Sequence, residues 1–130
     1  MFDRTISLVG EENFNKIKEK TVLVVGLGGV GGYATEALVR SVIHNLILID
    51  HDTIDITNLN RQIIALNSTI GVEKVLIMKN RIKDINAKIN VKYVVIIGEE
   101  EFKANKVTLK NMLTGEQKLV NLENLINEIL

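Results

Sequence analysis

TVLVVGLGGVG, residues 21–31, is the stretch of sequence that decides the fold. Its first five residues form an apolar, β-branched run without polar alternation, which predicts a central parallel strand buried on both faces. Gly26, Gly28 and Gly31 follow with the spacing G-x-G-x-x-G. In this spacing the first glycine permits a tight turn, the second lets backbone N–H groups approach a phosphate, and the third allows close packing of a helix on the strand. We therefore expect a strand, a phosphate-binding turn and a helix in succession.

The flanking sequence extends this unit into an alternating α/β pattern. Apolar residues recur at helical spacing over 30–41 and again over 72–86, so each stretch predicts an amphipathic helix. Residues 45–50 and 91–97 are apolar runs that predict further strands. Strand, helix and strand in this order form a βαβ unit, whose crossover is nearly always right-handed. Residues 51–69 are rich in Asn, Asp and Thr and predict a loop with a short helix.

The end of the chain carries a different signal. Thr114 and Gly115 form a turn between two short runs with strand character, which predicts a β-hairpin, and residues 123–130 predict a short helix. The expected fold class is α/β: a Rossmann-like parallel sheet flanked by helices, with a C-terminal β-hairpin and a short helix.

Composition limits the classes of protein that fit. The 130 residues suffice for about one domain, and 46% hydrophobic with 25% charged residues is typical of a folded globule. Sixteen basic and sixteen acidic residues leave no net charge, so a broad field for binding nucleic acid is absent. The absence of cysteine excludes disulfides, zinc knuckles and thiol nucleophiles and favours a reducing cytoplasm. We find no membrane-spanning run and no signal peptide in the sequence.

Charged residues beyond the glycines indicate a nucleotide. Asp50 ends the second predicted strand, where a carboxylate can accept hydrogen bonds from ribose hydroxyls. Arg61 and Lys74 follow it, and two cations near a glycine turn suit a triphosphate better than a dinucleotide. The alternative is that both are solvated surface charges, as either residue usually is when it stands alone.

Three segments together resemble a known family: GLGGVGGYATEALVRS, LILIDHDTIDITNLNRQ and STIGVEKVLIMKNRIKDIN. They are similar to the ThiF/MoeB, ubiquitin-activating-enzyme-like adenylating family, and within it to the tRNA threonylcarbamoyladenosine dehydratase branch, over about residues 2–91. The resemblance implies a domain that binds ATP with Mg²⁺ and adenylates a carboxylate. In that branch the carboxylate belongs to a modified adenosine of tRNA, which then cyclises with loss of water.

The resemblance also assigns roles to particular residues. Those it places on ATP are Gly26, Gly28, Gly29 and Gly31 as the phosphate loop, Asp50 and Asp52 as the acidic pair at the ribose, and Asn58, Arg61 and Lys74 at the phosphates. Arg61 and Lys74 would stabilise the leaving pyrophosphate. Arg4 matches an arginine that family members extend into the nucleotide site of a neighbouring protomer, which implies a homodimer. No metal ligand is assigned within this chain, because the family's magnesium-binding aspartate lies further downstream.

The chain departs from the family pattern at three places. Ser41-Val42-Ile43-His44 stands where the family has Ser-Gly-x-Gly, and Asn86-Ala87 stands where it has Asn-Pro. After Val91, residues 92–130 instead resemble the C-terminal end of the histidyl-tRNA synthetase anticodon-binding domain, through the segments GEEE, VTLKNM and TGEQ. We therefore divide the chain into an ATP-binding segment, 1–91, and a tail, 92–130, joined to the same sheet.

Four functions remain open at this point. The leading hypothesis is an ATP-binding module of the adenylating type that lacks complete catalysis. The others are a tRNA-binding accessory module governed by the tail, a folded chimera without activity, and a dinucleotide-binding domain. Glu99, Glu100 and Glu101 are interpreted as charges at a helix N-terminus, and His44 and His51 lack the spaced partners of a metal site.

Overall fold

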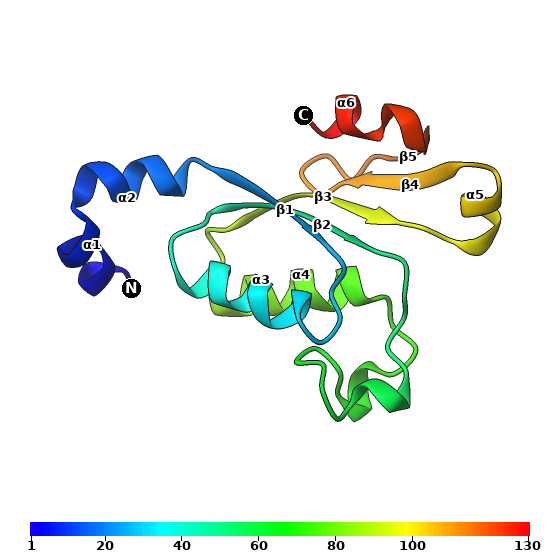
Figure 1. Ribbon diagram of the computed structural model, residues 1–130, viewed down its shortest axis with the longest axis horizontal. Helices are drawn as coiled ribbons and strands as arrows, with labels where there is room; N and C mark the ends of the chain where they lie inside the picture. The colour runs from blue at the N-terminus through cyan, green and yellow to red at the C-terminus, as the bar shows by residue number, and fades with distance from the viewer.

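A single five-stranded sheet runs through the molecule (Figure 1). The computed structural model describes residues 1–130. In spatial order the strands are β1 (Thr21–Val25), β2 (Asn45–Asp50), β3 (Asn90–Ile96), β4 (Lys106–Asn111) and β5 (Gln117–Asn121). The first three are parallel, while β4 and β5 are antiparallel. The predicted α/β class is confirmed, and the sheet is mixed because the C-terminal hairpin adds to its edge.

Helices cover the two faces of the sheet unequally. The long helices α3 (Gly31–Arg40) and α4 (Lys74–Ile85) lie on one face, and the short α6 (Leu125–Ile129) lies on the other (Figure 1). The remaining helices are α1 (Asp3–Val9), α2 (Glu11–Lys18), α5 (Glu99–Lys103) and three 3₁₀ turns at Ile56–Asn58, Asn67–Thr69 and Leu122–Asn124. Both crossovers that join the parallel strands therefore run over the same face.

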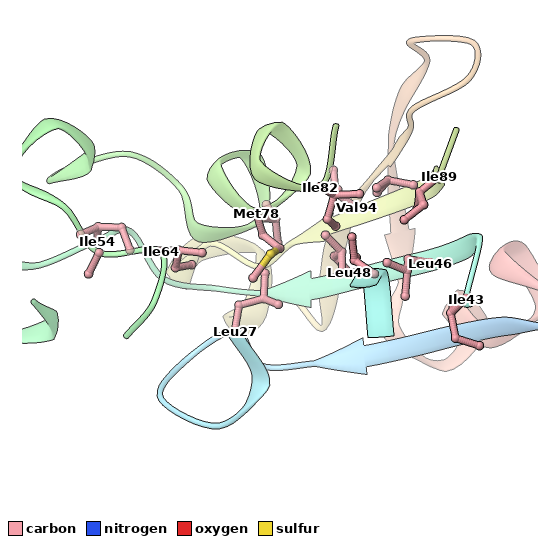
Figure 2. Packing of buried hydrophobic residues seen from close by; sticks show 14 residues of the cluster. Leu27, Ile43, Leu46, Leu48, Ile54, Ile64, Met78, Ile82, Ile89 and Val94 are labelled. Atoms are coloured by element: carbon pink, nitrogen blue, oxygen red, sulfur yellow. The ribbon is translucent and has the colours of Figure 1, made fainter. Parts of the chain in front are cut away.

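The main hydrophobic core lies between β2, β3 and the long helices. Leu46 and Leu48 of β2 and Val94 of β3 meet Ile82 and Met78 of α4 there (Figure 2). Leu27, which belongs to the glycine turn, is fully buried in the same cluster near Met78. The turn is therefore anchored to the core by its own side chain, and this fixes its position relative to the strands.

The predicted strands and helices are present, but one expectation about burial is wrong. β1 is an edge strand rather than a central one, since only β2 pairs with it. Val22 and Val24 pack on the main core, whereas Leu23 is 45% and Val25 is 71% exposed on the opposite face. The run of apolar residues does identify a strand, yet its place in the sheet depends on which strands pair with it, and sequence periodicity carries no information about that.

The N-terminal helices were not predicted from the sequence. Phe2 packs against Phe14 of α2 and His44, with ring centroids 5.7 and 5.8 Å away. His44 directly precedes β2, so α1 lies at the amino end of the parallel strands. Across the whole chain, no helix has the length and apolar character needed to cross a membrane.

The boundary predicted at residue 91 falls inside β3. This strand pairs with β2 on one side and with β4 on the other. A second, smaller core on the α6 face unites Ile47 and Ile49 of β2 with Val107 of β4 and Leu125 of α6. The tail is consequently built into the same sheet and shares a core with β2, while the division of the chain at residue 91 stays a prediction.

Candidate functional site

The glycine turn joins the carboxyl end of β1 to the start of α3. Gly26 has a φ of +88°, which favours glycine, and its N–H donates to the Ile49 carbonyl at 2.7 Å. A Cβ on Gly31 would lie 1.8 Å from the Gly26 carbonyl oxygen, so only glycine fits there. At Gly28 and Gly29 a Cβ would meet nothing closer than 3.7 Å. The fold therefore requires the first and third glycines, whereas Gly28 and Gly29 are not needed to avoid a clash within the protein.

Asp50 connects the end of β2 to this turn. The residue is 7% exposed, and its carboxylate accepts hydrogen bonds from the Leu27 N–H at 2.5 Å and the Asp52 N–H at 2.8 Å. A charged acceptor that receives two backbone N–H groups holds both segments in place. The predicted ribose acceptor thus lies at the glycine turn, and it also organises that turn.

Lys74 reaches the same place from the first residue of α4. It is 4% exposed, and its Nζ lies 2.9 Å from Asp52 Oδ2. The Lys74 N–H also donates to the Asp52 carbonyl at 3.0 Å, and His51 Nε2 lies 3.0 Å from Asp52 Oδ1. A continuous path of contacts therefore runs from the glycine turn through Asp50 and Asp52 to a buried cation.

Arg61 comes to the turn from the loop after β2. Its Cγ and carbonyl oxygen lie 3.9 and 3.7 Å from where a Gly29 Cβ would be. Its guanidinium is exposed and donates through Nη1 to the Thr57 carbonyl at 2.7 Å and to Asn60 Oδ1 at 3.0 Å. The two predicted cations thus lie on the same end of the sheet as the glycines.

Asn58 has a structural task in this loop. It is buried, and its Oδ1 accepts a hydrogen bond from the Asp55 N–H at 3.0 Å, which closes a capping box around a 3₁₀ turn. Hydrogen bonds from Thr57 hold the pKa of Asp55 below its ordinary value. Asn58 therefore shapes the loop that carries Arg61.

Gln62 was not among the predicted site residues. It is 8% exposed, its Oε1 is buried without a hydrogen-bond partner, and its Nε2 is 3.8 Å from where a Gly28 Cβ would be. A buried polar atom without a partner is uncommon in native proteins. The signal available in the sequence was its position directly after Arg61.

Arg4 lies apart from the other predicted residues. It is exposed on α1, which packs near the amino end of the parallel strands through Phe2 and His44, whereas the glycine turn follows their carboxyl end. Within one chain the two are separated by the length of the sheet. Any contact of Arg4 with this site requires a second copy.

Asp50, His51 and Asp52 bring metal-ligating atoms within 4.8 Å of one another, which their spacing in the sequence did not indicate. Both carboxylates are already engaged, Asp50 with backbone N–H groups and Asp52 with Lys74. The arrangement is a hydrogen-bonded cluster neutralised by a lysine, which makes it a poor resident site for a cation.

A cavity of about 320 Å³ adjoins this cluster at the carboxyl end of β3. His51, Ile97, Gly98, Glu99 and Phe102 line it, and its walls are mostly apolar. Gly98 directly precedes α5 and Glu99 begins it, so the tail of the chain supplies most of this lining. The glutamates interpreted as charges at a helix N-terminus do occupy the first turn of α5.

A glycine turn after a parallel strand, with an acid at the end of the next strand, defines the class of Rossmann-like α/β domains. The sequence profile of the ThiF family matches residues 2–112, beyond the residue at which we expected the resemblance to end. The chain belongs to the ThiF family.

Individual relatives agree with this assignment. The tRNA threonylcarbamoyladenosine dehydratase of Bacillus subtilis is 49% identical over 90 residues, which cover 69% of this chain and 35% of the relative. SUMO-activating enzyme subunit 2 of Dictyostelium discoideum is 38% identical over 69% of this chain and 14% of that protein. The crystal structure of the Escherichia coli tRNA N6-threonylcarbamoyladenosine dehydratase in complex with ATP superposes with a TM-score of 0.67 at 40% identity, covering 74% of this chain and 38% of that one.

The chain spans about a third of the length of the dehydratases that it matches. It is a module of the ThiF adenylating type that resembles tRNA threonylcarbamoyladenosine dehydratase over this part. These matches favour the adenylating module over a tRNA-binding accessory module related to histidyl-tRNA synthetase.

Proposed function

We propose that this chain binds ATP at the carboxyl end of β1 and β2. The observation that carries the proposal is that Asp50 and Arg61, from separate segments, lie against the glycine turn, while Lys74 bonds to Asp52 next to Asp50. Backbone N–H groups at a helix N-terminus and two cations provide what a triphosphate needs, and the acid provides a ribose acceptor. The relative of known structure that is most informative here is a complex with ATP.

The surroundings fit a nucleotide in two further respects. A Cβ at Gly28 or Gly29 would stand at ordinary van der Waals distance from Gln62 and Arg61, so neither glycine is required by close packing within the protein. The amide of Gln62, which has no partner for Oε1, lies beside Gly28 and can turn a donor or an acceptor towards a ligand. The mostly apolar cavity beside His51 falls at the lower end of the range that small-molecule sites occupy, and we assign it to the base.

Mg²⁺ would enter this site with the nucleotide. The two nearby carboxylates are engaged by backbone N–H groups and by Lys74, and Mg²⁺ is commonly held through substrate phosphates and water. When bound, the ion would neutralise phosphate charge. Because neither carboxylate is free to hold the ion, we expect the 130 residues to bind ATP without completing the adenylation of a carboxylate. That reaction requires the acceptor, the metal and the α-phosphate to be aligned.

A tRNA substrate and a homodimer belong to this proposal as expectations from the family. The dehydratases named above act on tRNA according to their names, and Arg4 can approach a nucleotide only from a second copy. The zero net charge predicts that any tRNA contact is local and does not arise from a general basic field.

The test is calorimetric titration of the chain with ATP and Mg²⁺, and separately with NAD. We expect ATP to bind with a Kd between micromolar and millimolar and NAD to bind more weakly. Arg61→Ala, which removes the exposed guanidinium of the residue whose Cγ lies next to Gly29, should weaken ATP binding at least tenfold. Arg40→Ala, at the far end of α3, is the matched control and should leave the Kd unchanged.

Two results would defeat the proposal. One is the absence of a binding signal at millimolar ATP. The other is tighter binding of NAD than of ATP, which would favour a dinucleotide-binding domain.

A further inference from the structure

The carboxylate of Asp52 lies between two side chains of very different exposure. Its Oδ2 is 2.9 Å from Lys74 Nζ, and its Oδ1 is 3.0 Å from His51 Nε2. The Lys74 side chain is 4% exposed and supplies the counter-charge that the carboxylate needs, whereas the His51 side chain is 68% exposed. The contacts proposed above for the phosphates and the ribose of ATP do not use the imidazole, so it is available for another purpose.

Asp52 determines which nitrogen of this imidazole can accept a hydrogen bond. A neutral imidazole carries one proton, and a nearby negative charge favours that proton on the nearer nitrogen, which is Nε2. Nδ1 then keeps its lone pair and is an acceptor. Because Lys74 already balances Asp52, charge balance does not require a second proton on the ring. His51 consequently offers one hydrogen-bond acceptor to a ligand.

His51 also lines the cavity of about 320 Å³ at the carboxyl end of β3. The other lining residues are Ile97, Gly98, Glu99 and Phe102, so the polar side chains of the cavity are those of His51 and Glu99. A glutamate carboxylate accepts hydrogen bonds and does not donate them. Both polar side chains of the cavity are therefore acceptors, and a ligand that suits it combines an apolar surface with a hydrogen-bond donor.

The place of His51 in the chain relates this cavity to the ribose. His51 directly follows Asp50, the proposed ribose acceptor, whose carboxylate bonds to the glycine turn. The base of a nucleotide is joined directly to its ribose, so a base in this cavity lies within reach of the residue next to the ribose acceptor. Adenine has an apolar ring and carries a donor, its exocyclic amino group. Adenine thus has the combination of groups that the cavity requires.

We propose that His51 binds the amino group of adenine through Nδ1, and that Asp52 holds the imidazole in the tautomer that makes this possible. The inference rests on the proposed ATP site and adds to it the residue that selects the base. Asp52 then serves both ends of the nucleotide, because its other oxygen bonds to Lys74, which is assigned to the phosphates. Glu99 is the competing acceptor, but it is exposed at the start of α5, whereas His51 is held by Asp52.

The test compares ATP with purine-riboside triphosphate, which is ATP without the amino group, by calorimetric titration in the presence of Mg²⁺. We expect the chain to bind ATP about fivefold more tightly, the size expected of one hydrogen bond between neutral groups. His51→Phe keeps an aromatic ring and removes the acceptor, so it should bind the two triphosphates equally well. Glu99→Ala, on the same cavity, is the matched control and should keep the fivefold preference.

Failure of this inference is distinguishable from failure of the ATP site. Equal affinities of the parent chain for the two triphosphates, or a preference for ATP that survives in His51→Phe, would overturn the role of His51 and leave the ATP site standing. A preference lost in Glu99→Ala would assign the amino group to Glu99 and would also overturn it. A chain that binds neither triphosphate would defeat the proposed ATP site, and this inference with it. Because His51 is largely exposed, His51→Phe should unfold at the same temperature as the parent.

Discussion

Lys74 Nζ lies 2.9 Å from Asp52 Oδ2, and the two partners differ sharply in exposure. The lysine side chain is 4% exposed, while that of the aspartate is 47% exposed. The pair ties the first residue of α4 to the segment that follows β2, next to the Asp50 carboxylate and the glycine turn. Removal of the aspartate and removal of the lysine should therefore change the free energy of unfolding by different amounts.

Asp52→Asn should destabilise the protein more than Lys74→Met. Loss of the carboxylate leaves a buried ammonium without its counter-charge, a change that typically costs about 3 kcal/mol or more. Loss of the lysine leaves a half-exposed carboxylate that water solvates, and we expect a change below about 1 kcal/mol. Urea unfolding at neutral pH measures both. Equal losses would show that the buried lysine does not depend on Asp52, and Lys74→Met should also weaken ATP binding.

Gly31→Ala and Gly28→Ala should separate folding from ligand binding. A Cβ at Gly31 would overlap the Gly26 carbonyl, so this variant should lose at least about 3 kcal/mol of stability or fail to fold. A Cβ at Gly28 has room, so its stability should stay within about 0.5 kcal/mol of the parent. ATP should bind Gly28→Ala at least tenfold more weakly, as measured by calorimetry. Unchanged ATP affinity would mean that the phosphates lie elsewhere.

Gln62→Met should stabilise the protein in the absence of nucleotide. The substitution keeps the side chain's length and removes a buried acceptor without a partner, whose penalty is about 1–3 kcal/mol. We expect the free energy of unfolding to rise by about 1 kcal/mol and ATP affinity to fall. Gln117→Met, at an exposed position of β5, is the control. A loss of stability in Gln62→Met would indicate that the amide is already satisfied.

The ion pair between α3 and α4 should make stability depend on pH. Arg81 Nε donates to Glu36 Oε2 at 2.5 Å, and this bond, with help from Arg40, holds the pKa of Glu36 below its ordinary value against the opposing effect of burial. A carboxylate whose pKa is lowered by folding stabilises the protein fully above its unfolded pKa, and this contribution disappears as the pH falls through the folded value.

Glu36→Gln should accordingly cost about 2 kcal/mol at neutral pH, and the difference from the parent should shrink progressively below pH 4.5, the ordinary pKa of the group. Urea unfolding over a pH series measures it. Glu12→Gln, whose partner Lys16 is largely exposed, should show no such trend. A difference that stays constant with pH would assign the effect to packing instead of charge.

Much of the architecture follows from local sequence patterns. The apolar runs mark β1, β2 and β3, helical spacing marks α3 and α4, and the Thr114-Gly115 turn marks the hairpin of β4 and β5. The short helices α1 and α2 went unpredicted, because they depend on contacts such as Phe2 with His44, which join residues far apart in the chain.

The candidate site, like the fold, has some features that local sequence predicts and others that depend on contacts between distant residues. Sequence alone determined the glycine turn, because a φ of +88° at Gly26 and the close approach at Gly31 are demands that only glycine meets. The sequence also determined that an acid, Asp50, and two cations, Arg61 and Lys74, follow the glycine turn. Tertiary structure alone decided that Asp52 neutralises Lys74, that Gln62 is buried without a partner, and that β1 ends the sheet. Each of these depends on which segments pack together, and packing is a property of the whole chain that no short pattern encodes.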